Sequence, residues 1–451
     1  MERTATQVLS GWGRFPRHAC TACRPERRQG LTEALQSTDY PTVIARGLGR
    51  SYGDPAVNEG GGVILCERLN RMLAFDPATG VLECEAGVSI EEILDTFVPR
   101  GFFPPVTPGT KFVTVGGAIA NDVHGKNHHR DGTFGMFVRE LTLLTPGGET
   151  LVCSPDERSD VFWATVGGIG LTGIILTAKV RLRPIETSYI RVDYIQSRNI
   201  HETLARFAES DAQYTYSVAW VDCLASGANL GRSVLMRGNH LPASELPDRK
   251  RDPLAVSRPL KKTAPFDFPG FVLNPLSIRA FNEVFYLSHP TRQGKIVDYD
   301  SYFYPLDAVL HWNRIYGRRG FTQYQISLPP DESEALVHVL ERLSASSRAS
   351  FLAVLKCFGP ANPGMLSHPF EGYTLTLDVP MKTGLVAFLQ DLDEYVLAHG
   401  GRLYLAKDAT TRPETIHAMY PRLDAFRAVK AQLDPGGRLS SSMARRLRIV
   451  E

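Results

Sequence analysis

Short strand-like runs of apolar and β-branched residues recur along most of the chain and predict β-sheet structure. Turn-forming residues separate many of them, as Pro146, Gly147 and Gly148 do after one such run. The runs span residues 42–45, 62–66, 81–86, 140–145, 174–182, 189–195, 214–222, 232–238, 353–360 and 373–380. With the helices described next, they predict an α+β protein.

Helical patterns lie between the strand-like runs. Ser89 is a suitable N-cap, acidic residues follow in the first turn, and Ile93, Leu94 and Phe97 would form one apolar face that ends by Gly101. Further helical patterns span residues 160–166, 201–209, 331–343 and 420–433. Near Pro184 glycine becomes rarer and aromatic residues increase, so we predict a domain boundary there.

The stretch from Pro108 to Gly135 is the least regular part of the pattern. It holds six glycines, three histidines and two lysines in 28 residues. This composition favours unusual backbone conformations and is not that of an ordinary helix or strand. Gly116 and Gly117 would let a ligand approach the backbone, with their amides pointing at an acceptor. We interpret the stretch as one wall of a cofactor pocket. The alternative is a glycine-rich surface loop.

A second glycine-rich loop, residues 41–54, begins as a strand and then breaks at Gly47, Gly49 and Gly53. Successive free amides form a concave anion site, and Arg46 and Arg50 would add bidentate partners. The spacing misses the dinucleotide fingerprint by one residue, and a turn and a strand follow where that fingerprint requires a helix. We therefore predict a pyrophosphate cradle between strands; a plain hairpin connection is the alternative.

A formal G-x-G-x-x-G at Gly168, Gly170 and Gly173 does not change this prediction. A strand, not a helix, is predicted directly after it, so a helix N-terminus for a pyrophosphate is missing. Close approach of the backbone to an adenosine or flavin edge explains these glycines better.

The composition is that of a globular protein. The chain has 451 residues, 43% hydrophobic and 22% charged, enough for two or three domains. A net charge of +2 gives no reason to expect nucleic-acid binding. The seven scattered cysteines suit a reducing compartment. No signal-peptide core and no apolar run of about 18 residues occur, so we expect a cytoplasmic or peripherally membrane-associated protein without a transmembrane helix.

Polar residues in apolar surroundings are the candidates for chemistry. Gln323 and Gln325 would share one face of a strand, and Lys356 lies inside an apolar strand, where a charge is costly unless it faces a cavity. Lys407 follows a short predicted strand. His124, His128 and His129 could in principle hold a metal, but Gly125 argues against the helix that this would need, and we predict none.

The segment 249–262 carries six basic residues against one acidic residue and is interrupted by prolines. Such a segment is most often a solvated mobile loop. It could also act as a lid or as a patch that meets anionic lipid headgroups.

These motifs together resemble the vanillyl-alcohol-oxidase family of FAD-dependent enzymes, and among them the enzymes that oxidise a polyprenylphosphoryl-β-D-ribose. The segments that carry the resemblance are IARGLGRSYGD, PGTKFVTVGGAIANDVHGKNHH, FWATVGGIGLTGII, GFTQYQ, GGRLYLAKD and the closing MYPRLDAF, LDPGGR and MARRL, in the family's order. The resemblance implies a PCMH-type FAD-binding domain from residues 1–186, completed by residues 401–451, around a substrate domain of residues 187–400 with an antiparallel sheet. It also implies an NAD-dependent keto-sugar reductase as partner.

The resemblance assigns residues to FAD and to the substrate. The expected FAD contacts are Arg46, Gly47, Leu48, Gly49, Arg50, Ser51, Tyr52, Gly53, Asp54, Gly109, Thr114, Val115, Gly116, Gly117, Asn121, Asp122, Val123, His124, Ile174 and Tyr404. The expected substrate contacts are Lys126, Trp220, Gln323, Gln325, Lys356, Thr374, Thr376 and Lys407. Many relatives bind FAD covalently through a histidine in the first loop; this loop has none, so we predict non-covalent FAD.

The chemistry implied is oxidation of the ribose 2′-hydroxyl to a ketone. Lys407 is the first candidate for the base, because desolvation can lower the pKa of a lysine, and Tyr52 and His124 are rivals. The chain departs from close relatives at Thr374 and Thr376, where they carry Asn and Cys, so the acceptor or the lipid chain can differ. The alternatives are an alditol or aldonolactone oxidase of the same superfamily and a flavin-binding protein without turnover.

Overall fold

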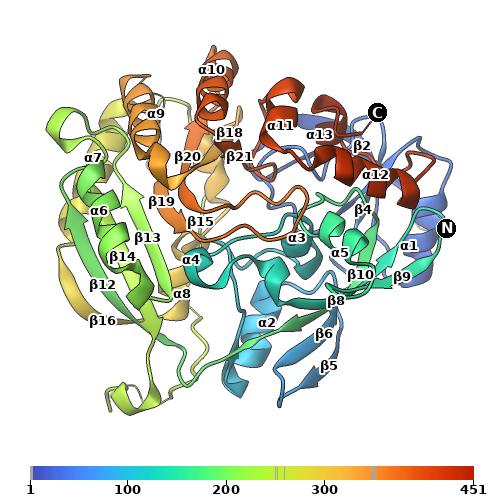
Figure 1. Ribbon diagram of the computed structural model, residues 1–451, viewed down its shortest axis with the longest axis horizontal. Helices are drawn as coiled ribbons and strands as arrows, with labels where there is room; N and C mark the ends of the chain where they lie inside the picture. The colour runs from blue at the N-terminus through green and yellow to red at the C-terminus, as the bar shows by residue number, and fades with distance from the viewer. Residues whose placement is uncertain are drawn as a thin grey trace.

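The computed structural model describes residues 4–248, 250, 252–258, 260–346, 348 and 352–450. Figure 1 shows two sides of the molecule. The N-terminal third and the C-terminus lie together on the right, and one large sheet with its helices lies on the left. The α+β organisation predicted from the sequence is confirmed.

The right-hand side contains two sheets. The strands of the first sheet have the spatial order β1-β2-β4-β3, in which β4 lies parallel to both β2 and β3. These strands are β1 (Ala5–Ser10), β2 (Arg17–Cys23), β3 (Val43–Arg46) and β4 (Gly62–Leu65). The second sheet is antiparallel, in the order β5-β6-β10-β8-β9. Its strands are β5 (Met72–Asp76), β6 (Val81–Glu85), β8 (Val138–Leu144), β9 (Thr150–Cys153) and β10 (Ile174–Arg181).

The helices of this side include three that the sequence predicted, namely α2 (Ile90–Phe97), α5 (Ser159–Thr165) and α12 (Leu423–Leu433), of which α12 begins three residues later than expected. Ser89 caps α2 in a capping box with Glu92. The other helices are α1 (Arg28–Gln36), α3 (Val115–Ala120), α4 (His128–Asp131), α11 (Pro413–Met419) and α13 (Ser442–Arg446). A short two-stranded ladder pairs β7 (Phe102–Phe103) with β11 (Arg183–Pro184).

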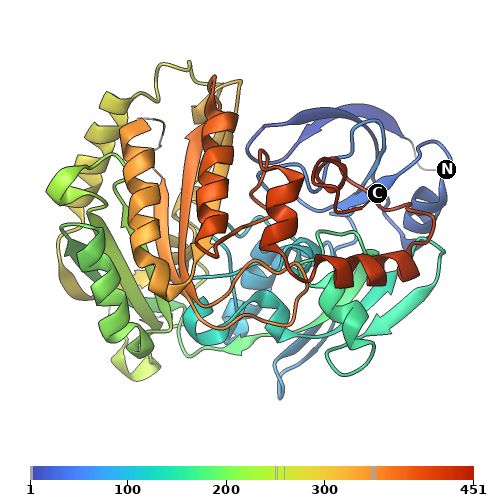
Figure 2. The same ribbon diagram turned by 45° about the horizontal axis from the view of Figure 1, so that its top comes forward.

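The C-terminal helices return to the first sheet. Leu439 forms a bridge to Val43 at the start of β3, and Arg446 on α13 is ion-paired with Asp54, just after the cradle loop. Both contacts place the last residues of the chain against the N-terminal part, as Figure 2 also shows.

The left-hand side is built on an eight-stranded antiparallel sheet, in the order β16-β12-β14-β13-β19-β20-β18-β21. Its strands are β12 (Tyr189–Ser197), β13 (Tyr216–Val221), β14 (Ser233–His240), β16 (Arg292–Asp298), β18 (Phe321–Leu328), β19 (Ala353–Phe358), β20 (Gly372–Pro380) and β21 (Arg402–Leu403). Strand β21 belongs to this sheet although it follows residue 400.

Helices cover one face of this sheet. Figure 2 shows α6 (Ile200–Ser210), α9 (Ser333–Ser346) and α10 (Leu385–Ala398) side by side in front of it. The opposite face meets the N-terminal part, and α7 (Pro275–Ser288) packs on its outer portion, where Phe285 contacts Trp220 of β13 with ring centroids 4.4 Å apart. The segment between α7 and β18 contains α8 (Tyr299–Phe303) and β17 (Val309–Leu310), which pairs with β15 (Lys262–Thr263).

Two sequence interpretations need correction or qualification. Residues 115–120 inside the glycine-rich stretch form helix α3, because Thr114 caps it and the small residues pack closely: a Cβ on Gly116 would lie 2.9 Å from the Cβ of Ala86. In the basic segment 249–262, residues 249, 251 and 259 lie outside the described residues. In the described part of the chain, no helix is both long and apolar enough to cross a membrane.

Candidate active site

A cavity of about 380 Å³ lies between the two glycine-rich loops and the free face of the large sheet. Residues 46–52 and 107–126 form one side. The segment 303–312 closes another side. The sheet contributes side chains from five strands, namely Val218, Met236, Gln323, Gln325, Val354, Lys356 and Thr376. The cavity therefore brings together the cradle loop, the glycine-rich stretch and the strand residues that the sequence marked as candidates.

The cradle loop presents a row of unsatisfied backbone donors. Tyr52 N–H donates to Ala406 O, but within the described residues the amides of residues 47–51 have no hydrogen-bond acceptor. Gly49 takes the left-handed conformation at φ +64° that lets the loop turn. Such a run of free amides is what a phosphate group needs, so the loop fits the pyrophosphate of a dinucleotide cofactor.

The two arginines of this loop behave differently. Arg50 lines the cavity, with its guanidinium carbon 4.2 Å from the centroid of a Trp12 ring. Arg46 donates instead to the carbonyl oxygens of Ala56, at 3.1 Å, and Ser10, at 2.8 Å. Arg46 also lines the cavity, so its role as a bidentate phosphate partner stays a prediction, while these two bonds fix the loop to its neighbours.

The glycine-rich wall packs directly on the cradle. A Cβ on Gly47 would lie 2.3 Å from Oγ1 of Thr114, so only glycine allows this contact. The amides of Gly116 and Gly117 donate to Ala86 O and Thr114 Oγ1. The expectation that these two amides point at a ligand is thus wrong: the glycines permit close packing, and both residues line the cavity.

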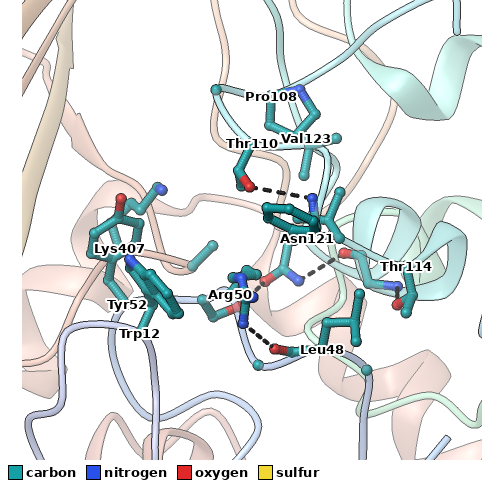
Figure 3. A pocket seen from close by; sticks show the side chains of 18 of the residues that line it. Trp12, Leu48, Arg50, Tyr52, Pro108, Thr110, Thr114, Asn121, Val123 and Lys407 are labelled. Carbon is teal, nitrogen blue, oxygen red and sulfur yellow. Dashed lines mark hydrogen bonds between the residues drawn. The ribbon is translucent and has the colours of Figure 1, made fainter. Parts of the chain in front are cut away.

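The carboxyl end of this wall is fixed by two side chains. Tyr404 Oη donates to the carbonyl oxygen of Asn121 at 2.6 Å, and the Asn121 amide donates to Gly117 O at 2.8 Å. Figure 3 shows Thr114, Asn121 and Val123 on one side of the pocket, and Trp12, Tyr52 and Lys407 on the other. The cavity between these groups also contacts Gly109 and Ile174.

Six of the expected contact residues do not line the cavity. Gly53, Asp54, Val115 and Asp122 are buried behind it; Asp122, for example, accepts a hydrogen bond from Asn362 at 2.6 Å and one from the Gly135 amide. Thr374 lies under Gln325, to which it is hydrogen-bonded at 3.2 Å. Trp220 packs on Phe285 of α7 instead.

Three lysines enter the cavity from different elements. Burial lowers the pKa of Lys407 to about 7, of Lys126 to about 7 and of Lys356 to about 8. Lys126 donates to the carbonyl oxygen of Tyr302, and Lys356 Nζ lies 3.5 Å from Nδ1 of His124. The three buried amines favour an anionic ligand, and their lowered pKa values allow an amine in the site to be neutral near pH 7.

The rival bases are less suited than Lys407. Burial raises the pKa of Tyr52 well above its usual value, so its hydroxyl keeps the proton. Burial also lowers the pKa of His124, whose Nε2 is 2.8 Å from Nε2 of Gln325. His128 and His129 have other partners, Gly359 N and Tyr214 O. Among the described residues, no group of His, Cys, Asp and Glu side chains could hold a metal ion.

Asp378 is a site residue that the sequence analysis missed. It is fully buried on β20 and accepts hydrogen bonds from Gln323 at 2.6 Å and from Tyr316 at 3.1 Å. Burial raises its pKa to about 7, and its charge counteracts the burial of Lys407 by raising the pKa of that lysine. The signal was present, since an aspartate inside an apolar strand is as unusual as Lys356.

Trp12, Asp307, His311 and Trp312 also line the cavity without having been predicted. Trp12 and Trp312 form an edge-to-face pair with ring centroids 5.8 Å apart. No local pattern marks these residues, because they come from loops and short 3-10 helices that only the folded chain brings together.

Comparison with known proteins agrees with this geometry. A family described as "FAD binding domain" matches residues 24–154, and one described as "D-arabinono-1,4-lactone oxidase" matches residues 373–447. The protein is thus an FAD-dependent oxidoreductase, and FAD is its cofactor. It is 41% identical to the decaprenylphosphoryl-β-D-ribose oxidase of Mycolicibacterium smegmatis over 99% of this chain and 98% of the relative. The chain belongs to the decaprenylphosphoryl-β-D-ribose oxidase family.

Two other relatives place this family in a wider group. A protein of Streptomyces coelicolor known as "Uncharacterized protein in mprA 5'region" is 38% identical over 80% of this chain and 100% of its own length. Cytokinin dehydrogenase 9 of Oryza sativa subsp. japonica is 29% identical, over 40% of this chain and 35% of its own. The resemblance to FAD-dependent oxidases found in the sequence is confirmed.

Proposed function

We propose that this protein oxidises the ribose 2′-hydroxyl of a polyprenylphosphoryl-β-D-ribose to the 2′-keto sugar, the first half of an epimerisation to the arabinose donor for cell-envelope glycans. The observation that carries the proposal is Lys407, a buried lysine with a pKa of about 7 between the cradle loop and the substrate face of the sheet. A relative that matches along the whole chain bears the name of this activity.

In this reaction the hydroxyl loses a proton and the carbon loses a hydride. FAD, when bound, supplies the hydride acceptor. The neutral Lys407 amine would take the hydroxyl proton, and Asp378 beside it would stabilise the ammonium that forms. Gln323 and Gln325 would orient the sugar by hydrogen bonds, since both line the cavity from one face of their strand.

The phosphate of the substrate requires cationic partners, and Lys126 and Lys356 are suited to that role. Both are buried in the cavity wall, and neither forms an ion pair with a carboxylate in the described part of the chain. Thr376 would face the same substrate from β20. The cradle of residues 46–52 and the wall of residues 109–124 would hold FAD without a covalent bond, because residues 46–54 contain no histidine.

Further parts of the proposal concern partners and organisation. An NAD-dependent reductase would convert the keto sugar to the arabinose form, because the ketone must be reduced on its opposite face. The basic segment 249–262 would contact a membrane peripherally. Residues 1–186 and 401–451 would form the FAD-binding domain around a substrate domain of residues 187–400, supported by the contact of Arg446 with Asp54.

Anaerobic titration with decaprenylphosphoryl ribose, followed by the flavin absorbance, tests the proposal. We expect stoichiometric bleaching of the flavin absorbance and a keto sugar as product. The match of residues 373–447 to D-arabinono-1,4-lactone oxidase supports an alditol or aldonolactone oxidase as a second candidate. Bleaching by such free sugars, with none by the lipid-linked ribose, would favour it. If neither the lipid-linked ribose nor the free sugars reduce the flavin, the protein binds flavin without turnover.

A further inference from the structure

Large apolar side chains are exposed in one continuous segment of the substrate side. Seven of the eleven large hydrophobic residues that are exposed in the described parts of the chain lie between residues 260 and 287. They are Leu260, Phe266, Phe271, Leu276, Phe281, Val284 and Leu287, with exposed fractions from 44% to 98%. We call residues 260–288 the apolar strap. An exposed apolar surface of this kind marks a site of interaction.

Helix α7 within the strap carries large apolar side chains on two different faces. Ile278 and Asn282 are buried, and Phe285 packs on Trp220, so one face of the helix is held by the sheet. Leu276, Val284 and Leu287 lie close together on a different face, at about 100° per residue, and are 64–78% exposed. A helix that only covers a sheet would carry polar residues there. The described residues therefore leave the second apolar face open to a partner.

The strap is continuous with the wall of the cavity. Lys262 and Thr263 pair with Val309 and Leu310, and both of these line the cavity. Leu273 packs into a hydrophobic cluster with Trp312, another cavity residue. An apolar chain that leaves the cavity past this wall would reach the exposed side chains of the strap directly.

The charges of the strap favour an anionic surface. Residues 260–288 contain three basic and two acidic side chains, and one of the basic residues, Lys261, is paired with Glu91. Both acidic residues are paired with arginines from other elements, Asp267 with Arg14 and Glu283 with Arg232. Lys262 and Arg279 are exposed beside the apolar residues. Apolar residues flanked by basic ones are the composition of a segment that lies in the interface of an anionic bilayer.

We infer that the apolar strap docks on the surface of an anionic lipid bilayer. Leu276, Val284 and Leu287 of α7 enter the headgroup region, and the adjoining cavity wall faces the bilayer so that a prenyl chain can pass from lipid to site. This inference rests on the proposed function for the identity of the substrate, and it differs from a contact made by the basic segment 249–262 alone. That segment is partly occupied within the protein: Arg258 is paired with Asp95.

Vesicle flotation with the FAD-loaded protein tests the inference. The probe is vesicles of phosphatidylglycerol and phosphatidylcholine, compared with vesicles of phosphatidylcholine alone. The test variant is the triple substitution Leu276→Asn, Val284→Asn and Leu287→Asn, and the matched control is Val8→Asn, Leu73→Asn and Val152→Asn, three apolar residues exposed on the other side of the molecule. We expect at least tenfold weaker binding of the test variant and no change in the control.

A second readout separates docking from folding and from catalysis. The test variant should oxidise a short-chain, water-soluble polyprenylphosphoryl ribose at the wild-type rate. Its oxidation of decaprenylphosphoryl ribose in vesicles should be at least tenfold slower than that of the wild type. Equal vesicle binding by the test variant, or no binding by the wild type, would overturn the inference. So would a wild-type dimer in sedimentation that the test variant abolishes, because the face would then be a contact between two copies.

The outcome can also separate this inference from the proposed function. Vesicle binding needs no substrate. If the test variant loses vesicle binding while no polyprenylphosphoryl ribose reduces the flavin of either protein, docking stands and the proposed substrate is wrong.

Discussion

The ammonium group of Lys407 lies 3.9 Å from the centre of the Tyr52 ring. The two residues come from opposite ends of the chain, and a backbone hydrogen bond from Tyr52 N–H to Ala406 O, 2.9 Å long, joins their loops. The aromatic face gives the lysine a partner that does not remove its proton. This contact therefore places an amine with a pKa near 7 at the junction of the cradle and the substrate sheet.

Replacing Lys407 by alanine should abolish oxidation without releasing FAD. The amine is expected to take the proton from the substrate, and loss of a general base costs about 10²–10⁴-fold in rate. Stopped-flow measurement of flavin reduction under anaerobic conditions checks the rate, and the absorbance ratio of the purified protein checks FAD content. Reduction at more than a tenth of the wild-type rate would remove Lys407 from the mechanism.

Asp378→Asn should move the pH dependence of flavin reduction to lower pH. Below its pKa of about 7 Lys407 is charged and cannot accept a proton, so the rate rises with pH through that value. The negative charge of Asp378 raises the pKa of Lys407, so loss of that charge lowers the pH at which the rate is half-maximal. Asp393→Asn is the matched control. Asp393 is also a buried carboxylate with a pKa of about 7, but it accepts a hydrogen bond from Thr411 and does not influence the pKa of Lys407. An unchanged or raised midpoint in Asp378→Asn would contradict the prediction.

Gly47→Ala should weaken FAD binding strongly. The new Cβ would lie 2.3 Å from Oγ1 of Thr114 and push the cradle away from the glycine-rich wall. We expect protein with a native circular dichroism spectrum that loses its yellow colour on gel filtration, with FAD affinity at least tenfold lower by titration. The control is Gly436→Ala, because a Cβ there meets no atom within 4 Å. Full retention of FAD in Gly47→Ala would show that the two loops tolerate separation.

Arg446→Gln should destabilise the protein. Its guanidinium lies 2.7 Å from Asp54 and 2.9 Å from Asp408, and both carboxylates are 2% exposed. Removing the cation leaves two buried negative charges near each other, which costs about 3–5 kcal/mol. Urea denaturation followed by tryptophan fluorescence measures the free energy of unfolding. The control Arg448→Gln removes an exposed ion pair with Glu414 and should change the free energy of unfolding by less than about 1 kcal/mol. Similar losses in the two variants would count against a buried ion network.

Local chemistry along the chain was enough to predict several features. Ser89 and the acidic residues after it predicted α2, because a capping box involves only neighbouring residues. The glycines of residues 47–53 predicted a loop with free amides, and the strand pattern of residues 174–182 correctly excluded a helix after Gly173. Lys356 was recognised because a charge among apolar strand residues is costly in any fold.

Features that depend on distant neighbours needed the tertiary structure. Alternation along β13 places Trp220 on the same sheet face as Val218, but only packing decides that α7 covers the first and the cavity meets the second. Likewise, the amide of Gly116 is satisfied by Ala86 O, which only the fold brings near. The contact of Lys407 with Tyr52 joins residues from opposite ends of the chain. The sequence by itself thus determined which residues could do chemistry, whereas burial, which sets the pKa of each lysine, arises only when remote segments close around it.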